Sequence, residues 1–259
     1  MSSLLVVENL SVAFSGLRAL SDVTFSVSEH EIVGLIGPNG AGKTTLLNCI
    51  SRLYTPQAGT LNFAGKDLLR LPVHAIPVEG ITRTFQNLEL SGEATALENV
   101  GVSSMRRFRT NLLAELLALP SSRRNTAAGE AAALVALEQL GLAEYARERV
   151  ADLSYGVQKR IEIARALAGE PRLMLLDEPA AGLNPEETRA LGETIRQMRA
   201  DKGVSILLIE HDMRLVMDVC DRLVVLDHGE CISVGAPDVV RNDPAVIDAY
   251  LGSEAENDT

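Results

Sequence analysis

The stretch GPNGAGKTT, residues 37–45, constrains the fold of this 259-residue chain more than any other feature. It fits the pattern G-x-x-x-x-G-K-[ST], and it lies between EIVGLI and TLLNCI, which predict a strand and a helix. Glycine adopts positive φ readily, so successive backbone N–H groups can face one concavity at a helix N-terminus and bind phosphate oxygens. The pattern predicts a phosphate-binding loop rather than a glycine-rich turn without a ligand. Its predicted nucleotide-binding residues are Gly37, Pro38, Asn39, Gly40, Ala41, Gly42, Lys43, Thr44 and Thr45.

Three side chains at the end of this loop have predicted roles. Lys43 should reach the β and γ phosphates of a nucleoside triphosphate. The hydroxyl of Thr44 should ligate Mg²⁺, and Thr45 can add a further hydrogen bond to phosphate.

A second segment, RLMLLDEP, carries two carboxylates. An apolar strand that ends in Asp177 and Glu178 would place both beside the phosphate loop. Asp177 is expected to hold Mg²⁺ through water, and Glu178 to polarise the water that attacks the γ-phosphate. The alternative, two solvated acids closing a strand, does not account for their pairing with the loop.

Strands and helices alternate along the chain, which predicts an α/β fold. The runs LLVVENL, VAF and DVTFSV predict an antiparallel sheet packed beside the nucleotide core, and RLMLLDE and VSILLIE predict buried parallel strands. Between the last two, Asn184, Pro185 and Glu187 predict the N-cap, N1 and N3 of a helix. The predicted core face of that helix is Leu191, Ile195 and Met198.

The region from about 100 to 150 favours helix. One apolar series at helical spacing is Met105, Phe108, Leu112, Leu116 and Leu119; a second is Ala133, Leu137 and Leu140, ending at Gly141. We therefore expect a single domain over 1–252, followed by a disordered acidic tail over 253–259. Within the domain, the core and β subdomain should occupy about 1–99 and 168–252, and an inserted helical subdomain about 100–167.

Composition narrows the class of protein further. The net charge of −11 argues against a nucleic-acid partner, because phosphate backbones select basic surfaces. The chain shows no signal-peptide pattern, and no apolar run approaches the roughly 20 residues of a membrane span. We expect a soluble chain whose cysteines, Cys49, Cys220 and Cys231, are buried, reduced thiols.

The segment LSYGVQKRIEIARAL, residues 153–167 and here called the signature segment, resembles the signature of the ATP-binding-cassette (ABC) family. Without the family, Ser154 and Gly156 would be an N-cap serine and a turn glycine. The resemblance implies that they bind ATP instead, because in this family the signature of one subunit covers the γ-phosphate held by its partner. The implied fold is a P-loop NTPase core with an N-terminal antiparallel β subdomain and an inserted α-helical subdomain.

The resemblance extends to three further residues. Gln86 in RTFQN matches a glutamine that monitors Mg²⁺ and the attacking water, and His211 in LLIEHDM matches a histidine that contacts the γ-phosphate. Phe14 lies where the family places an aromatic ring against adenine, although it could instead be a core residue of the small sheet. The implied catalytic residues are Lys43, Gln86, Glu178 and His211, and the implied Mg²⁺ ligands are Thr44, Gln86 and Asp177.

Two departures from the common family pattern bear on the subfamily. Tyr155 stands where many members have glycine, and Asn184 where many have aspartate. Together with RTFQN, DEPAAGLNP, IEHDMRLVM and VIDAYLG, they resemble the ATPase subunits of branched-chain amino acid importers.

That resemblance implies a peripheral ATPase, using ATP and Mg²⁺, on the cytoplasmic side of a bacterial inner membrane. Its implied partners are a second ABC ATPase subunit, identical or paralogous, two membrane permease subunits and, indirectly, a periplasmic or extracellular solute-binding protein. A urea or other solute importer, and a soluble non-transport ABC ATPase, remain alternatives. A small-molecule phosphoryl transferase would leave the signature segment and His211 unexplained.

Overall fold

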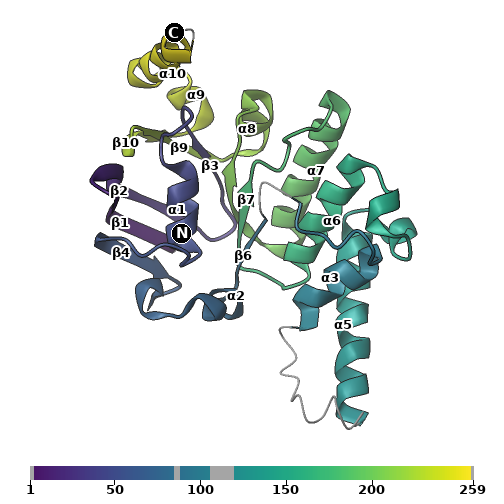
Figure 1. Ribbon diagram of the computed structural model, residues 1–259. Helices are drawn as coiled ribbons and strands as arrows, with labels where there is room; N and C mark the ends of the chain where they lie inside the picture. Colours follow the sequence, from purple (N-terminus) through teal and green to yellow (C-terminus); the bar gives the residue numbers. More distant parts are fainter. Residues whose placement is uncertain (1–2, 85–87, 106–119, 258–259) are drawn as a thin grey trace.

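The computed structural model describes residues 3–84, 88–105 and 120–257 (Figure 1). Its centre is a six-stranded sheet in the order β10-β9-β3-β8-β7-β6, parallel except for β10. The strands are β3 (Ile32–Ile36), β6 (Ile81–Arg83), β7 (Leu173–Asp177), β8 (Ser205–Ile209), β9 (Arg222–Asp227) and β10 (Glu230–Gly235). Every residue of β3, β7 and β8 is buried, which is why these strands read as continuous apolar runs. The predicted parallel strands are confirmed.

Alternate residues of this sheet pack into two different cores. Met174 and Leu176 face a cluster formed with α5, α6, α7 and α8, whereas Leu173 and Leu175 face a cluster formed with α1 and the second sheet. The helices on the core are α1 (Lys43–Ile50), α2 (Ile76–Glu79), α7 (Pro185–Lys202), α8 (Met213–Val219), α9 (Pro237–Val240) and α10 (Pro244–Asn257). Short 3₁₀ turns, η1 (Leu68–Arg70) and η2 (Val73–Ala75), precede α2.

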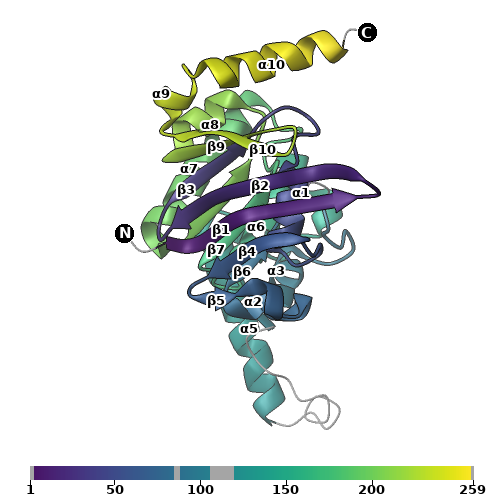
Figure 2. The same ribbon diagram turned by 90° about the vertical axis from the view of Figure 1, so that its left-hand side faces the viewer.

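The second sheet is antiparallel, as predicted, in the order β2-β1-β4-β5. Its strands are β1 (Ser3–Phe14), β2 (Leu17–Ser28), β4 (Ala58–Phe63) and β5 (Lys66–Asp67). LLVVENL and VAF prove to be parts of the one strand β1; register shifts and the positive φ of Asn9 interrupt its alternation, so the sequence reads as two runs. Figure 2 shows the β1–β2 hairpin crossing in front of the central sheet.

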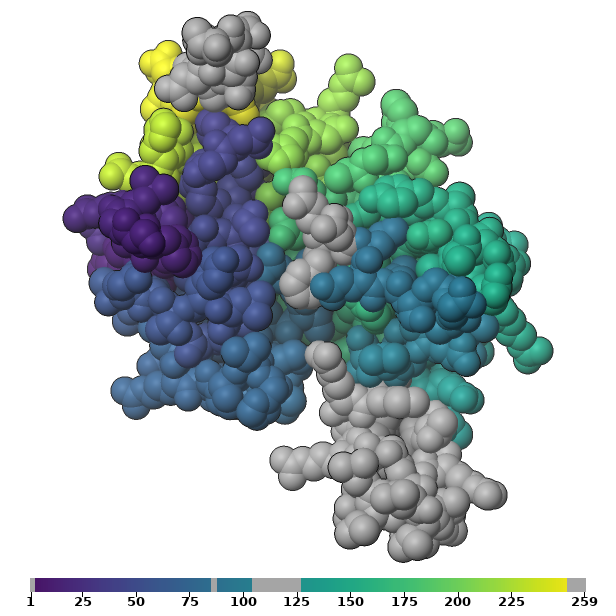
Figure 3. All heavy atoms as spheres, viewed as in Figure 1, coloured from purple at the N-terminus to yellow at the C-terminus, as the bar shows by residue number. Residues whose placement is uncertain are grey.

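The chain forms several helices after β6 and before β7. They make up the side of the molecule opposite the N-terminal strands (Figure 3). They are α3 (Ala96–Met105), α5 (Pro120–Gln139), η3 (Ala143–Tyr145), η4 (Val150–Asp152) and α6 (Tyr155–Leu167). Ala133, Leu137 and Leu140 are buried, and Gly141 has a φ of 63°, so the predicted core series and helix stop are confirmed. Phe108, Leu112, Leu116 and Leu119 lie outside the described residues.

The predicted start of helix α7 is confirmed. The start of α7 is a capping box: Asn184 accepts from the N–H groups of Glu186 and Glu187, and the Glu187 carboxylate accepts from the N–H of Asn184. Helix α10 continues to Asn257, whereas the acidic composition predicts a disordered tail over 253–259, which stays a prediction. Alanine and glutamate in this segment are good helix formers, which is consistent with the extent of α10.

Candidate functional site

The phosphate loop joins β3 to α1, and its glycines are required by backbone geometry. Gly37 has a φ of 144°, and a Cβ there would lie 1.9 Å from the carbonyl oxygen of Leu226. Gly42 has a φ of 99°, and a Cβ would lie 2.6 Å from the carbonyl oxygen of Ala19. Only glycine fits either position, so the loop can fold back over the N-terminus of α1.

Lys43 is buried at the centre of this loop. Its Nζ donates hydrogen bonds to the carbonyl oxygens of Gly37, at 2.6 Å, and Pro38, at 2.7 Å. Burial lowers the pKa of the Lys43 ammonium, while Glu178 and Asp177 act in the opposite direction. A cation is therefore held against the backbone of the loop at the N-terminus of α1, where phosphate binding is favoured.

Two predicted catalytic residues meet at the carboxyl ends of β7 and β8. The Nε2 of His211 lies 2.7 Å from the Oε1 of Glu178, although the residues are 33 apart in sequence. Adjacent parallel strands end at the same edge of a sheet, which explains the meeting. Glu178 has a φ of 48°, unusual for a residue other than glycine, and its N–H donates to the carbonyl oxygen of Ile209. The carboxylate that should polarise water is thus fixed by backbone and side chain.

Asp177, at the end of β7, is also buried and paired. Its Oδ2 accepts from the Nη2 of Arg83 at 2.8 Å, and its N–H donates to the Oγ1 of Thr84. Thr44, in the first turn of α1, is an exposed residue. Thr44 and Asp177 are the two predicted Mg²⁺ ligands among the described residues. Their hydroxyl and carboxylate oxygens are of the type that Mg²⁺ prefers.

Glu210 and Tyr250 were not predicted from the sequence, yet both contact the site. The Glu210 carboxylate accepts from the N–H groups of Ala180 and His211, and burial raises its pKa. Burial also raises the pKa of the Tyr250 phenol, against a hydrogen bond from the N–H of Gly37. The glutamate in IEHD and the tyrosine in VIDAYLG were visible in the sequence, but nothing local indicated these partners.

The signature segment lies elsewhere. Ser154 is the exposed N-cap of α6 and accepts from the N–H of Val157 at 3.4 Å, and a Cβ on Gly156 would lie 2.4 Å from the Oε1 of Glu187. Figure 1 shows α6 and α1 on different sides of β6 and β7. The structure therefore does not bring Ser154 and Gly156 together with the phosphate loop of the same chain.

Phe14 and Gln86 have different outcomes. The Phe14 side chain is 44% exposed and packs edge-on against Tyr54, with ring centroids 5.1 Å apart. It is therefore not a core residue of the small sheet, and its contact with adenine stays a prediction. Gln86 lies outside the described residues.

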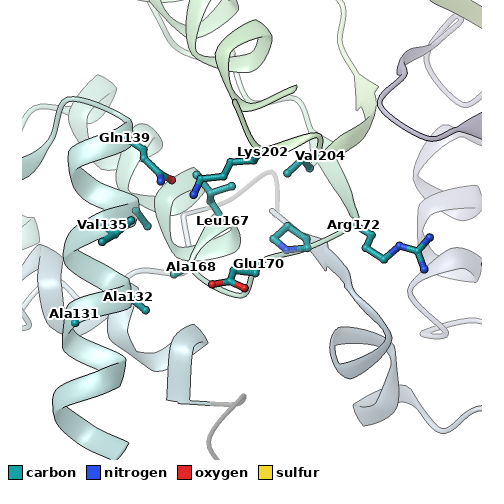
Figure 4. A pocket seen from close by; sticks show the side chains of 12 residues that line it. Ala131, Ala132, Val135, Gln139, Leu167, Ala168, Glu170, Arg172, Lys202 and Val204 are labelled. Atoms are coloured by element: carbon teal, nitrogen blue, oxygen red, sulfur yellow. The ribbon is translucent and has the colours of Figure 1, made fainter. Parts of the chain in front are cut away.

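A separate hollow of about 610 Å³ lies between α5, the end of α6 and the end of α7. Figure 4 shows Val135, Leu167 and Lys202 around it. None of the predicted site residues lines it, so the hollow is distinct from the phosphate loop.

The fold and the site together define a P-loop NTPase of the cassette type. The chain belongs to the ABC transporter family, whose model matches residues 20–181, and a model described as branched-chain amino acid ATP-binding cassette transporter matches residues 230–256. The chain is 44% identical over 249 residues to the high-affinity branched-chain amino acid transport ATP-binding protein BraF of Pseudomonas aeruginosa, covering 96% of this chain and 98% of BraF.

Two solved structures bear on the nucleotide state and assembly of such cassettes. The ADP conformation of MJ1267, an ATP-binding cassette of an ABC transporter, has a TM-score of 0.84 and 30% identity, over 97% of this chain and 100% of that one. A dimeric post-hydrolysis state of the cassette MJ0796, bound to ADP and Pi, has a TM-score of 0.73 and 25% identity, over 90% and 98%. The chain is thus an ATP-hydrolysing cassette of a family whose cassettes dimerise. Within the part of the chain that the structure describes, no helix is long and apolar enough to cross a membrane.

Proposed function

We propose that this chain hydrolyses ATP to drive the uptake of branched-chain or related amino acids, as a peripheral subunit on the cytoplasmic side of a bacterial inner membrane. The single observation that carries the mechanism is the separation of the signature segment from the phosphate loop. A chain built this way holds one half of each of two reaction centres. Two cassettes arranged head to tail would complete both centres.

Within one centre, the described residues have distinct tasks. The N–H groups of the loop and Lys43 bind and orient the β and γ phosphates. Glu178 accepts a proton from the attacking water, and His211, hydrogen-bonded to it, holds that carboxylate in place and contacts the γ-phosphate. Ser154 and the first N–H groups of α6 from the partner cassette would cover the γ-phosphate.

The residues present fit Mg²⁺. Among the described residues no group of three or more His, Cys, Asp or Glu side chains could hold a metal ion, but Mg²⁺ bound with a nucleotide needs few protein ligands, because it keeps waters and phosphate oxygens. Thr44 and Asp177 would hold it, and Gln86 is a further proposed ligand. When bound, Mg²⁺ neutralises charge that develops on the phosphates.

The solute assignment is supported by relatives rather than by the site. BraF is a branched-chain amino acid transport protein by name, and the match over residues 230–256 extends that similarity to the C-terminus. The proposed partners are a second cassette, two permease subunits and, indirectly, a solute-binding protein. Gln86 and the proposed helical subdomain, about 100–167, are the proposed contacts with the permease.

Transport by a reconstituted complex tests this proposal. The chain is co-expressed with its candidate permease subunits and second cassette, and ATP-dependent uptake of leucine and of urea is measured in vesicles that also receive the solute-binding protein. Leucine uptake that is lost with Glu178→Gln is expected. ATP-driven uptake of urea alone would contradict the solute, and a chain that never co-purifies with membrane subunits would contradict the transport role.

The proposed contact of Phe14 with adenine has its own test. Phe14→Ala should weaken ATP binding by roughly 2- to 10-fold, since an aromatic contact is worth about 0.5–1.5 kcal/mol. Binding of inorganic triphosphate, which has no base, should not change. Equal losses for both ligands, measured by titration calorimetry, would contradict stacking on the base.

A further inference from the structure

Arg83, the last residue of β6, is buried at the edge of the central sheet, with 8% of its side chain exposed. Its Nη2 donates to the Oδ2 of Asp177 at 2.8 Å, and its Nη1 donates to the Oδ1 of Asn48 at 2.7 Å. A weaker contact of 3.4 Å joins Nη1 to the Oγ of Ser51. One guanidinium thus connects the end of β7 with helix α1.

These two connections converge on the proposed Mg²⁺ ligands. Asp177 is one of those ligands. Asn48 lies four residues after Thr44, the other described ligand, so both occupy the same face of α1, one turn apart. Arg83 therefore holds one ligand directly and the helix that carries the other through the next turn.

The backbone beside Arg83 supports the same point. β6 pairs with β7 in parallel, with Arg83 opposite Leu175. The N–H of Thr84 donates to the carbonyl oxygen of Leu175, and the hydroxyl of Thr84 accepts from the N–H of Asp177. The end of β6 consequently fixes both the main chain and the carboxylate of Asp177.

The chemistry of the pair favours a geometric role over a purely stabilising one. The side chains of Arg83 and Asp177 are 8% and 6% exposed, and burying two charges costs about as much as their attraction returns. A planar guanidinium can direct separate N–H groups at acceptors on two different elements, whereas a lysine ammonium is a single point charge.

We propose that Arg83 is a positioning residue of the Mg²⁺ site, which sets the placement of the Asp177 carboxylate relative to Thr44. The inference rests on the proposed function, because it requires nucleotide and Mg²⁺ to bind at this loop. It assigns Arg83 no contact with the substrate, so its effect must pass through Asp177 and α1.

The test compares ATP binding with Mg²⁺ and with EDTA, by titration calorimetry on the full chain, for wild type, Arg83→Gln and Arg83→Lys. Arg83→Gln should weaken the apparent Mg²⁺ affinity of the ATP-bound protein by roughly 10- to 100-fold, as loss of an outer partner of a metal ligand does. ATP affinity in EDTA should stay within about threefold, because the loop itself is untouched. The apparent Mg²⁺ affinity of Arg83→Lys should lie between those of wild type and Arg83→Gln. Lysine keeps the positive charge but cannot direct separate N–H groups at both Asp177 and Asn48.

Asn48→Ala removes the hydrogen bond between Arg83 and α1 but keeps the one between Arg83 and Asp177. It should weaken the apparent Mg²⁺ affinity by less than Arg83→Gln does. It also carries the test if Arg83→Gln does not fold, which thermal unfolding would reveal. The matched control is Arg199→Gln, which removes another ion-paired arginine, 2.6 Å from Asp221 and outside the loop, and should change neither affinity.

The outcomes separate this inference from the proposed function. Wild-type Mg²⁺ dependence in folded Arg83→Gln, or in Asn48→Ala where the arginine variant fails to fold, would overturn the positioning role. Equal losses with Mg²⁺ and with EDTA would also overturn it, because they indicate a structural role only. A wild-type chain that binds no ATP in either condition would overturn the proposed function, and this inference with it.

Discussion

The two halves of the proposed reaction centre are built differently. The strand-end half, comprising residues 37–45, Asp177, Glu178 and His211, contains a buried Lys43 and Asp177 and the paired carboxylate and imidazole of Glu178 and His211. The signature half, comprising residues 154–156, exposes Ser154 and leaves the Tyr155 side chain 45% exposed. The first half is organised by the sheet of its own chain, whereas the second presents a helix N-terminus outward.

The contacts of each half explain this difference. Parallel strands bring Glu178 and His211 to one edge of the sheet, so the chain supplies its own partners there. Around the signature half, Gly156 packs against Glu187, and Tyr155 packs against Gly182 and lies beneath the Lys159 ammonium. Those contacts fix the helix end and leave Ser154 at the surface. One half is therefore predicted to bind nucleotide alone, and the other to act only on a partner.

The largest expected effect is on turnover in the strand-end half. Glu178→Gln should lower ATP hydrolysis by roughly 100- to 10,000-fold, because it removes the proposed general base. ATP affinity should be retained, and closed dimers should accumulate. Phosphate release and size-exclusion chromatography with ATP measure both. Rapid multiple-turnover hydrolysis by this variant would contradict the assignment of Glu178.

The next largest expected effect is on ATP affinity, which should depend on the strand-end half and not on the signature half of the same chain. Lys43→Ala should weaken ATP binding to the isolated chain by roughly 10- to 100-fold, since a charge-assisted contact to phosphate is lost. Ser154→Ala should leave that affinity within about twofold, because Ser154 caps α6, which packs in a different core from α1. Titration calorimetry at low protein concentration distinguishes them. A similar loss of ATP affinity in both variants would contradict the claim that only the strand-end half binds nucleotide in the isolated chain.

A smaller expected effect is on the stability of the fold, and it should leave nucleotide binding unchanged. Arg222 is the first residue of β9, so it lies at the amino ends of the parallel strands, away from the site at their carboxyl ends. It donates to the Glu31 carboxylate at 2.8 Å. Burial raises the pKa of Glu31, but hydrogen bonds from Arg222 and the N–H of Ser28 outweigh it, and the pKa lies below its ordinary value of 4.5. Arg222→Gln should cost about 1–3 kcal/mol near neutral pH without changing ATP affinity.

The pH dependence of that cost follows from the direction of the shift. A carboxyl with a lowered folded-state pKa stabilises the fold above its unfolded pKa, and the stabilisation is lost as the pH falls through the folded value. The difference between wild type and Arg222→Gln should therefore shrink below the ordinary pKa of 4.5, as measured by urea unfolding across pH. A difference that grows on acidification would contradict the ion pair.

The smallest effect concerns the helix next to the signature half. Asn184→Ala should destabilise the chain by about 1 kcal/mol, because it removes the N-cap of α7. Asn184→Asp keeps a capping oxygen and should change the unfolding free energy by less than about 0.5 kcal/mol. Thermal unfolding compares the two. Equal destabilisation by both variants would show that capping is not the role of Asn184.

Features set by local spacing could be predicted from the sequence. The loop between strand and helix, the capping box at Asn184 and the stop at Gly141 each depend on residues within one turn of one another. The buried parallel strands were equally clear, because a strand covered on both faces needs an uninterrupted apolar run.

Features that depend on distant pairing could not be predicted from the residues alone. The bond between Arg83 and Asp177 spans 94 residues and requires the three-residue strand β6, which has no distinctive pattern. The resemblance predicted that His211 belongs to the site, but its bond with Glu178 became visible only once β7 and β8 were paired. The exposure of Phe14 likewise depends on how β1 ends beside Tyr54.

The central claim, that each chain holds two halves of different reaction centres, is tested most directly by mixing two inactive variants. Lys43→Ala and Ser154→Arg should each abolish hydrolysis alone, because every site in either dimer lacks one half. An equal mixture should recover about a quarter of wild-type activity, since half the dimers are mixed and each then has one intact site. A mixture that stays inactive while wild type hydrolyses ATP, or full activity of Ser154→Arg alone, would contradict the account.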